Sequence, residues 1–208
     1  MGGIFALKVG VYAICKNESQ FVDRFMDSMS EADYVCVLDT GSSDDTVERL
    51  RARGAIVGET VVSPWRFDTA RNESLGLIPA DADICCAIDL DEQFHPGWRA
   101  ALERAWQPDT TRARYRYTWS FRPDGSEGMV FWADKIHKNG CYRWASPVHE
   151  TLSYTGEGAE RFVDAAGVQL DHHPDETKSR GQYLPLLELA VREDPQNDRN
   201  CHYLGREY

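Results

Sequence analysis

Long apolar runs and an excess of positive charge are both missing from this 208-residue sequence. No apolar segment approaches the roughly 20 residues that a membrane-spanning helix needs, and Met1–Val11 lacks the basic start and cleavage site of a secretory leader. Aspartate and glutamate number 34 against 23 lysines and arginines, so the net charge is −11. Such a surface repels nucleic-acid backbones and anionic lipid. We therefore expect a cytoplasmic protein without a membrane span.

Cysteine pairs with metal-binding spacing are also missing. The six cysteines include no CxxC pair, which argues against a cysteine-based zinc site. Cys36, Cys85 and Cys86 lie in apolar runs, so free core thiols are favoured over a disulfide framework. The glycine patterns GxGxxG and GxxxxGK[ST] are absent as well, which argues against dinucleotide and P-loop chemistry.

The first half of the sequence contains an alternation of strand and helix patterns. Apolar, β-prone runs predict strands at residues 7–14, 34–38, 55–57 and 83–88. Apolar stripes and capping residues predict helices at residues 19–29, 46–53 and 66–77. This alternation, which continues to about residue 105, indicates an α/β fold with a mostly parallel sheet covered by helices. Ligands bind such sheets beyond the carboxyl ends of the strands.

After residue 110 the pattern becomes that of a small antiparallel, aromatic-rich region. Residues 112–121 and 129–137 alternate like two strands joined by a turn. Residues 182–192 predict an amphipathic helix, and residues 200–208 the beginning of another. We therefore expect one domain over residues 1–175, with a nucleotide-binding half to about residue 105 and an acceptor half from 106, followed by a C-terminal helical segment over residues 176–208.

Asp89-Leu90-Asp91 follows a predicted buried strand. Positions i and i+2 of extended backbone face the same side, so Asp89 and Asp91 can share a hard divalent cation. A cation held there can neutralise a diphosphate leaving group. A solvated acidic turn is the competing interpretation, and an isolated match would favour it. The position at the end of a strand in an α/β half favours the metal site.

Two further polar segments belong to the same predicted edge of the sheet. Asp39 ends a strand and can accept a hydrogen bond from a nucleobase or a ribose hydroxyl, although residues 39–44 can equally form a plain turn that caps a helix. Asp68 and Arg71 share one face of a predicted helix, where they can serve a ligand or simply form an ion pair.

Histidines concentrate in two short segments of the second half. Glu150 or His149 can act as a base toward an acceptor hydroxyl, and His172 or His173 can complete a metal site that carboxylates begin. A structural or solvated role is the alternative for each histidine. The aromatic residues of this half can wall an acceptor site or fill the core, especially Trp132, Tyr142 and Trp144.

In their order along the chain, these segments resemble family 2 glycosyltransferases of the GT-A fold. The resemblance rests on VGVYAICKNE, VLDTGSSDDT, FDTARNESL and AIDLDE, followed by WASPVHETL and LDHHP. The last two, with the helix in RGQYLPLLELAVREDPQND, are similar to a bacterial and phage subgroup in which a tetratricopeptide-like tail often follows. We therefore expect the final helix to begin a helical repeat that continues in a longer natural chain.

The resemblance implies a metal-dependent, inverting enzyme of the hexosyltransferase type, with Mn²⁺ or Mg²⁺ and a UDP-sugar favoured. It implies Asp91 as the direct metal ligand, His172 as another with His173 as its substitute, and Asp89 facing ribose or metal. Glu150, or else His149, is implied as the general base. Nucleotide-sugar contacts are expected from Ile14, Asn17, Glu18, Asp39, Ser42, Asp44, Asp68, Arg71, Asp89 and Leu90. Leu90 departs from the small residue common at this position, and we expect its side chain to point away from the metal.

Two other functions fit parts of the sequence. A nucleotidyltransferase needs a glycine-rich basic loop after its first strand, where this chain has Cys15–Glu18 without glycine. A non-catalytic nucleotide-sugar-binding module would not need the carboxylates and histidines that are present. The donor sugar and the acceptor stay open: a glycan, a peptide, another small nucleophile, or a modified nucleic-acid base. The last requires a local basic patch, for which the candidates are Arg112, Arg114 and Arg116.

Overall fold

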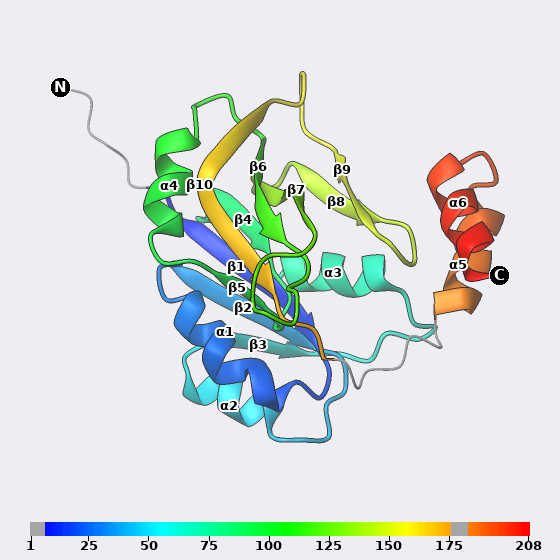
Figure 1. The fold of residues 1–208 in the computed structure, drawn as a ribbon, viewed down its shortest axis with the longest axis horizontal. Helices are drawn as coiled ribbons and strands as arrows, with labels where there is room; N and C mark the ends of the chain where they lie inside the picture. The colour runs from blue at the N-terminus through cyan, green and yellow to red at the C-terminus, as the bar shows by residue number, and fades with distance from the viewer. Residues whose placement is uncertain (1–6, 176–182) are drawn as a thin grey trace.

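The computed structural model describes residues 7–175 and 183–208, and these residues build a mixed α/β fold on one eight-stranded sheet (Figure 1). The strand order is β3-β2-β1-β4-β7-β6-β10-β5. The strands of this sheet are β1 (Val9–Cys15), β2 (Tyr34–Asp39), β3 (Ile56–Glu59), β4 (Ile84–Ala87), β5 (Glu92–Phe94), β6 (Arg112–Thr118), β7 (Val130–Lys138) and β10 (Phe162–His172). β1 to β4 are parallel, and β7 is antiparallel to both of its neighbours. The predicted α/β, GT-A Rossmann-like fold is confirmed.

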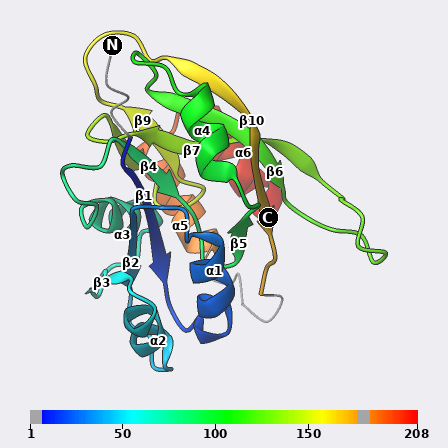
Figure 2. The same cartoon turned by 90° about the vertical axis from the view of Figure 1, so that its left-hand side faces the viewer.

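Two layers cover the sheet, one on each face (Figure 2). A 3₁₀ turn (Ser19–Phe21) leads into α1 (Val22–Ser28), which packs with α2 (Thr46–Ala52) and α4 (Trp98–Ala105) against one face. The other face is covered by α3 (Phe67–Leu75) and by the antiparallel hairpin of β8 (Tyr142–Ala145) and β9 (Thr151–Tyr154). Apolar side chains therefore occupy both faces of the central strands, as the continuous apolar run of β1 predicts.

β1 shows how the sequence specifies this layering. Val9, Val11 and Ala13 belong to the core under α1 and α4, while Tyr12 points to the opposite core. At Gly10 a Cβ atom would lie 2.7 Å from Cδ1 of Ile78, so the Ile78 side chain packs directly against the glycine backbone and a larger residue would require it to move. The carboxyl end of β1 faces the site described below.

A buried hydrogen-bonded chain fixes α3 to the sheet. The indole Nε1 of Trp144 donates to the Tyr12 hydroxyl over 2.8 Å, and that hydroxyl lies 2.9 Å from Nε2 of His137. The Asn72 amide donates to the Trp144 carbonyl and accepts from the Trp144 N–H, each over 2.9 Å. The Arg71 guanidinium lies 5.2 Å from the centroid of the Trp144 ring, so the same tryptophan also packs against Arg71.

The C-terminal segment forms two helices, α5 (Tyr183–Glu193) and α6 (Asp198–Glu207), beside α3 (Figure 1). Leu186 and Leu187 of α5 pack on Val148, and Arg66 forms an ion pair with Glu193. Both helices were predicted, although Gln182, the expected start of the first, lies outside the described residues. A helical repeat continuing beyond them stays a prediction.

Other expectations concern strands, cysteines and membrane spans. β5 was not predicted, because its three residues immediately follow the acidic turn and show no alternation. Cys36, Cys85 and Cys86 are buried free thiols, as predicted. Of the helices in the described part of the chain, none combines the length and the apolar character that a bilayer span requires.

Candidate active site

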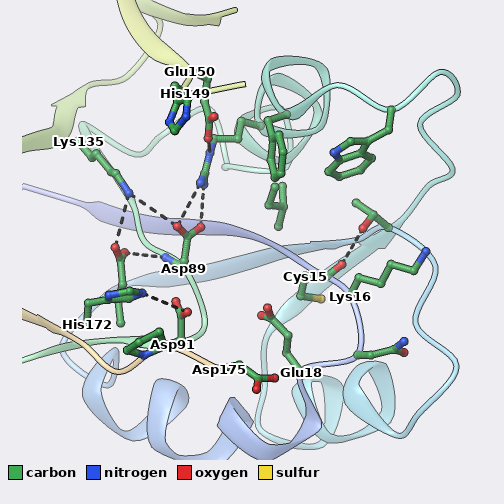
Figure 3. Close-up of a pocket in the computed structure, with 18 of the residues that line it drawn as sticks. Cys15, Lys16, Glu18, Asp89, Asp91, Lys135, His149, Glu150, His172 and Asp175 are labelled. Atoms are coloured by element: carbon green, nitrogen blue, oxygen red, sulfur yellow. Dashed lines mark hydrogen bonds and ion pairs between the residues drawn. The ribbon is translucent and has the colours of Figure 1, made fainter. Parts of the chain in front are cut away.

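A cavity of about 860 Å³ opens at the carboxyl ends of β1 and β4, where the α/β pattern predicts a ligand site (Figure 3). Its walls come from both halves of the chain and from α5. Charged and imidazole groups in the wall are Lys16, Glu18, Arg71, Asp89, Asp91, Glu92, Lys135, His149, Glu150, His172 and Asp175. This mixture of charges distinguishes the cavity from an apolar gap in the core.

Asp91 and His172 meet in this cavity, as predicted, although they lie far apart in the sequence. The Asp91 carboxylate is 3.4 Å from Nε2 of His172. Strand pairing causes this approach, because His172 lies opposite Glu92 in the β5–β10 ladder and the N–H of His173 donates to the Asp91 carbonyl over 2.8 Å. The His173 ring instead stacks on Phe121, so the structure favours His172 over its neighbour.

The surroundings of His172 orient its ring. Its Nδ1 lies 3.0 Å from the Trp119 carbonyl, and the ring stacks on the Trp119 indole at 4.4 Å between centroids. With Nδ1 donating to that carbonyl, Nε2 faces the Asp91 carboxylate, to which it can donate when the ring is protonated; in the neutral ring Nε2 has the lone pair that a metal would need. Burial alone would lower the pKa of His172, but the Asp91 carboxylate outweighs it and raises this pKa.

A carboxylate oxygen and an oriented imidazole nitrogen suit Mn²⁺ or Mg²⁺ as a donor set. The hydrogen bond from Nδ1 to a carbonyl is the outer-shell contact that metal-ligating histidines typically make. Within residues 7–175 and 183–208, however, no three or more His, Cys, Asp or Glu side chains gather into a metal-binding group. Among the described residues, Asp91 and His172 are therefore a pair of candidate ligands, and a metal there would need further ligands from water or substrate.

Asp89 faces cations rather than the Asp91–His172 pair. Its two oxygens accept hydrogen bonds of 2.9 and 3.1 Å from the Arg71 guanidinium, and Lys135 Nζ lies 3.7 Å away. Burial would raise the pKa of the Asp89 carboxyl, but Arg71 and Lys135 outweigh it and hold this pKa well below its usual range. The expected ligand role of Asp89 is thus not supported by its contacts.

Arg71 links Asp89 to Glu150, and all three residues line the cavity. Its Nε donates to the Glu150 carboxylate, so every nitrogen of the buried guanidinium has an acidic partner. We call Arg71, Asp89, Glu92, Lys135 and Glu150 the ion network. The alternative of an Asp68–Arg71 ion pair is wrong, because Asp68 pairs with Arg66 and Arg71 pairs with Asp89 and Glu150.

Glu150 and His149 both line the cavity, as the base candidates must. His149 has a left-handed backbone (φ 49°), which is unfavourable for a residue other than glycine. Its ring stacks on Tyr203 of α6 at 4.0 Å, and Arg199 donates to its carbonyl. The C-terminal helices thus hold this loop in a form that points Glu150 toward Arg71.

Lys135 and Glu92 were missed as site residues. Glu92 accepts the Asp89 N–H over 2.8 Å and the Tyr117 hydroxyl proton, and burial raises the pKa of its carboxyl. Burial would lower the pKa of Lys135, but Glu92 and Asp89 raise it above its usual value. The only sequence signal was a lysine amid the apolar residues of VFWADKIHK, which strand alternation explains equally well.

The polar side chains at the ends of β1 and β2 and in the loops that follow mostly form hydrogen bonds within these two loops. Asp39 accepts the N–H groups of Gly41 and Ser42 over 3.0 and 2.9 Å. The Asn17 side chain accepts from the N–H of Ser43 over 2.7 Å, and Asp44 accepts from that of Thr46 over 3.1 Å. We call Asn17, Asp39, Ser42 and Asp44 the loop cluster.

Only part of the expected nucleotide contacts line the cavity. Ile14, Asn17 and Glu18 do so, together with Arg71 and Asp89. The cavity wall does not include Asp39, Ser42, Asp44, Asp68 and Leu90. Leu90 is fully buried in the apolar core, which matches the expectation that its side chain points away from the metal and corrects its place among the nucleotide contacts.

The aromatic wall and the basic patch also differ from expectation. Tyr142 and Trp144 are buried in the core beneath α3, and Trp132 is exposed outside the cavity. The aromatic residues that line the cavity are Trp65, Phe67, Tyr117, Trp119 and Tyr183. The three arginines of β6 each form an ion pair with a carboxylate, so they do not make a free basic patch.

No protein-family model matches the chain. Among solved structures, it is similar to one described as a mycobacterial protein, at 16% identity and a TM-score of 0.54, over 82% of this chain and 69% of that one. That likeness concerns the fold alone.

The chain also matches part of glucosyl-3-phosphoglycerate synthase from Mycobacterium tuberculosis. The complex of that synthase with Mg²⁺ and uridine diphosphate matches at 27% identity and a TM-score of 0.44, over 53% of this chain and 44% of that one. Its complex with Mn²⁺ and UDP-glucose matches at 26% identity, with the same TM-score and coverage. The chain therefore spans less than half the length of that synthase.

Proposed function

We propose that this protein is a metal-dependent inverting glycosyltransferase that uses a nucleoside-diphosphate sugar, preferably a UDP-sugar, as its donor. The observation that carries the proposal is the approach of the Asp91 carboxylate to Nε2 of His172, at 3.4 Å, in a cavity at the carboxyl ends of parallel strands. A carboxylate and an imidazole at that edge suit a divalent metal, Mn²⁺ or Mg²⁺.

Asp91 and His172 are the residues that would hold the metal. When bound, a divalent metal supplies positive charge to the leaving diphosphate. Ile14, Asn17 and Glu18, in the loop after β1, form the wall on which we place the nucleotide. Hydrogen bonds between Asn17 and the loop after β2 support this wall, because they fix the loops after β1 and β2 against each other.

Glu150 is the general base of this proposal. Inversion by a single displacement needs one group that takes the proton of the attacking nucleophile. Glu150 faces the cavity, and Arg71 holds its carboxylate in place. His149 is less suited, because its ring stacks on Tyr203. Hexosyl transfer to a hydroxyl or a similar nucleophile is the reaction that this arrangement supports best.

Isothermal titration of UDP and GDP in the presence of Mn²⁺ tests the proposal. We expect the wild-type protein to bind one of them. Loss of contacts that merely support a metal ligand costs roughly 10- to 100-fold in affinity, so Asp91→Ala should weaken this binding by at least about 100-fold. Slow release of UDP or GDP from the matching nucleotide-sugar should disappear in the same variant.

Asp109→Ala is the matched control, because Asp109 is an exposed aspartate outside the cavity. It should leave both measurements unchanged. Equal nucleotide affinity in the wild type and in Asp91→Ala would refute the metal site. Release of pyrophosphate from a nucleoside triphosphate, without release of a nucleoside diphosphate from a nucleotide-sugar, would instead identify a nucleotidyltransferase.

A further inference from the structure

Lys135 reaches the cavity because β7 contains a β-bulge. Ala113 of β6 pairs with Ile136, whereas Tyr115 pairs with Ala133, so Asp134 and Lys135 together lie opposite one residue of β6. The extra residue breaks the alternation of the strand, and Ala133 and Ile136 both stay buried in the same core. A bulge beside a ligand site commonly re-aims a side chain, and here Lys135 becomes part of the cavity wall.

The contacts of Lys135 hold its charge in place and leave its hydrogen-bond donors available. Its Nζ lies 3.5 Å from a Glu92 oxygen and 3.7 Å from an Asp89 oxygen (Figure 3). Both distances exceed the roughly 3.2 Å of an N–H···O hydrogen bond. A lysine ammonium has three N–H donors, and its side chain here is 29% exposed. A phosphate in the cavity can therefore receive shorter, charge-assisted hydrogen bonds from this group.

Arg71, the other cation beside Asp89, is less free to serve a ligand. Its Nε donates to Glu150, and its two terminal nitrogens donate to Asp89 over 2.9 and 3.1 Å. A ligand that took over these donors would leave two carboxylates without their partner, which is costly in a buried site. Lys135 would give up only its long contacts to Asp89 and Glu92 when it binds a phosphate. It is therefore better suited than Arg71 to bind a phosphate.

We propose that Lys135 binds the terminal phosphate of the nucleoside diphosphate, next to the position of Asp91 and His172. Asp89 then serves to position the cations Arg71 and Lys135. Positive charge thus comes to the diphosphate from a protein side chain as well as from the metal site. The inference rests on the proposed function, since it presumes that a nucleoside diphosphate occupies this cavity.

The test compares diphosphate and monophosphate binding by isothermal titration with Mn²⁺, using UDP against UMP and GDP against GMP. For whichever base binds, Lys135→Met should weaken the diphosphate roughly tenfold, the worth of one charged hydrogen bond, and leave the monophosphate unchanged. Lys138→Met is the matched control, because Lys138 is an exposed lysine of the same strand outside the cavity. It should change neither affinity.

The possible results separate the two claims. Equal weakening of diphosphate and monophosphate in Lys135→Met, or no weakening of either, would overturn the role of Lys135 while wild-type binding still supports the proposed function. A wild-type protein that binds neither UDP nor GDP would overturn both. If Lys135→Met fails to fold, Lys135→Gln keeps a donor for Glu92 and should lose the same diphosphate preference.

Discussion

The ion network lines the cavity, whereas the loop cluster reaches the cavity wall only at Asn17, and the partners of the two groups differ. Every side chain of the loop cluster bonds to the loops after β1 and β2, largely to backbone N–H groups. The ion network instead joins charges from α3, from the turn after β4, from β5, β7 and the loop between β8 and β9. Its members meet only when the whole sheet is assembled.

This difference separates the shape of the site from its chemistry. Polar side chains that satisfy nearby backbone groups fix loop conformation, and their loss costs local hydrogen bonds. Charges that face one another across a cavity are costly to remove from water. A ligand that enters the cavity can contact them and replace their ion pairs. We therefore expect loop-cluster variants to lose modest stability and ion-network variants to lose both stability and ligand affinity.

Replacing the central cation of the ion network should have the largest effect. Arg71→Met leaves Asp89 and Glu150 without their shared partner, and uncompensated buried charges typically cost about 3–5 kcal/mol. Urea denaturation at pH 7 measures this loss. Arg104→Met, at an exposed arginine of α4, is the control and should stay within about 0.5 kcal/mol of the wild type. A loss below about 1 kcal/mol for Arg71→Met would mean that water compensates these charges, and the contrast would fail.

The fold was largely predictable because its signals are local. The buried runs that became β1, β2 and β4, and the apolar stripe of α1, depend on residues close in sequence. β5 has three residues and is defined by its pairing with β10, whose position the sequence pattern does not give. The parallel pairing of β6 with β10 is likewise a long-range result that local periodicity does not contain.

The proximity of the candidate site residues was predictable to the extent that these residues end strands, while their roles stay predictions. Asp91 and His172 each follow or end a strand, and the topology brought them together as expected. Lys135 could not be predicted in this way, because its direction depends on a bulge in the pairing of two strands. Asp39 and Asp44 are aspartates like Asp91, but their carboxylates accept hydrogen bonds from nearby loop N–H groups. These local hydrogen bonds satisfy the two carboxylates without a ligand.

The next largest effect concerns His137, which belongs to the buried hydrogen-bonded group of Trp144, Tyr12 and His137. Burial lowers the pKa of His137 to about 4, against about 6.5 in an unfolded chain. The unfolded state therefore takes up the proton first, and stability present above pH 6.5 is lost as the pH falls toward 4. Between pH 7 and pH 4.5 this group should cost about 2–3 kcal/mol of unfolding free energy.

His137→Gln isolates that contribution, because glutamine can still bond Tyr12 and the Lys138 carbonyl but does not titrate. Urea denaturation at both pH values should show a smaller decrease for the variant than for the wild type. Identical decreases would show that His137 does not set this pH dependence. The ion network would then be the part of the molecule to test.

The smallest effect is expected in the loop cluster, where a variant should lose some stability but little ligand affinity. Asp44→Ala removes the acceptor of the Thr46 N–H at the start of α2, and loss of such a cap typically costs about 1 kcal/mol. Asp109→Ala is the control, because Asp109 is an exposed aspartate outside both the loop cluster and the cavity. Since Asp44 does not line the cavity, UDP or GDP affinity should stay within about twofold of the wild type, well under the tenfold of one charged contact. A tenfold loss of affinity with unchanged stability would show that Asp44 contacts the nucleotide directly, and the loop cluster would then share the chemistry assigned here to the ion network.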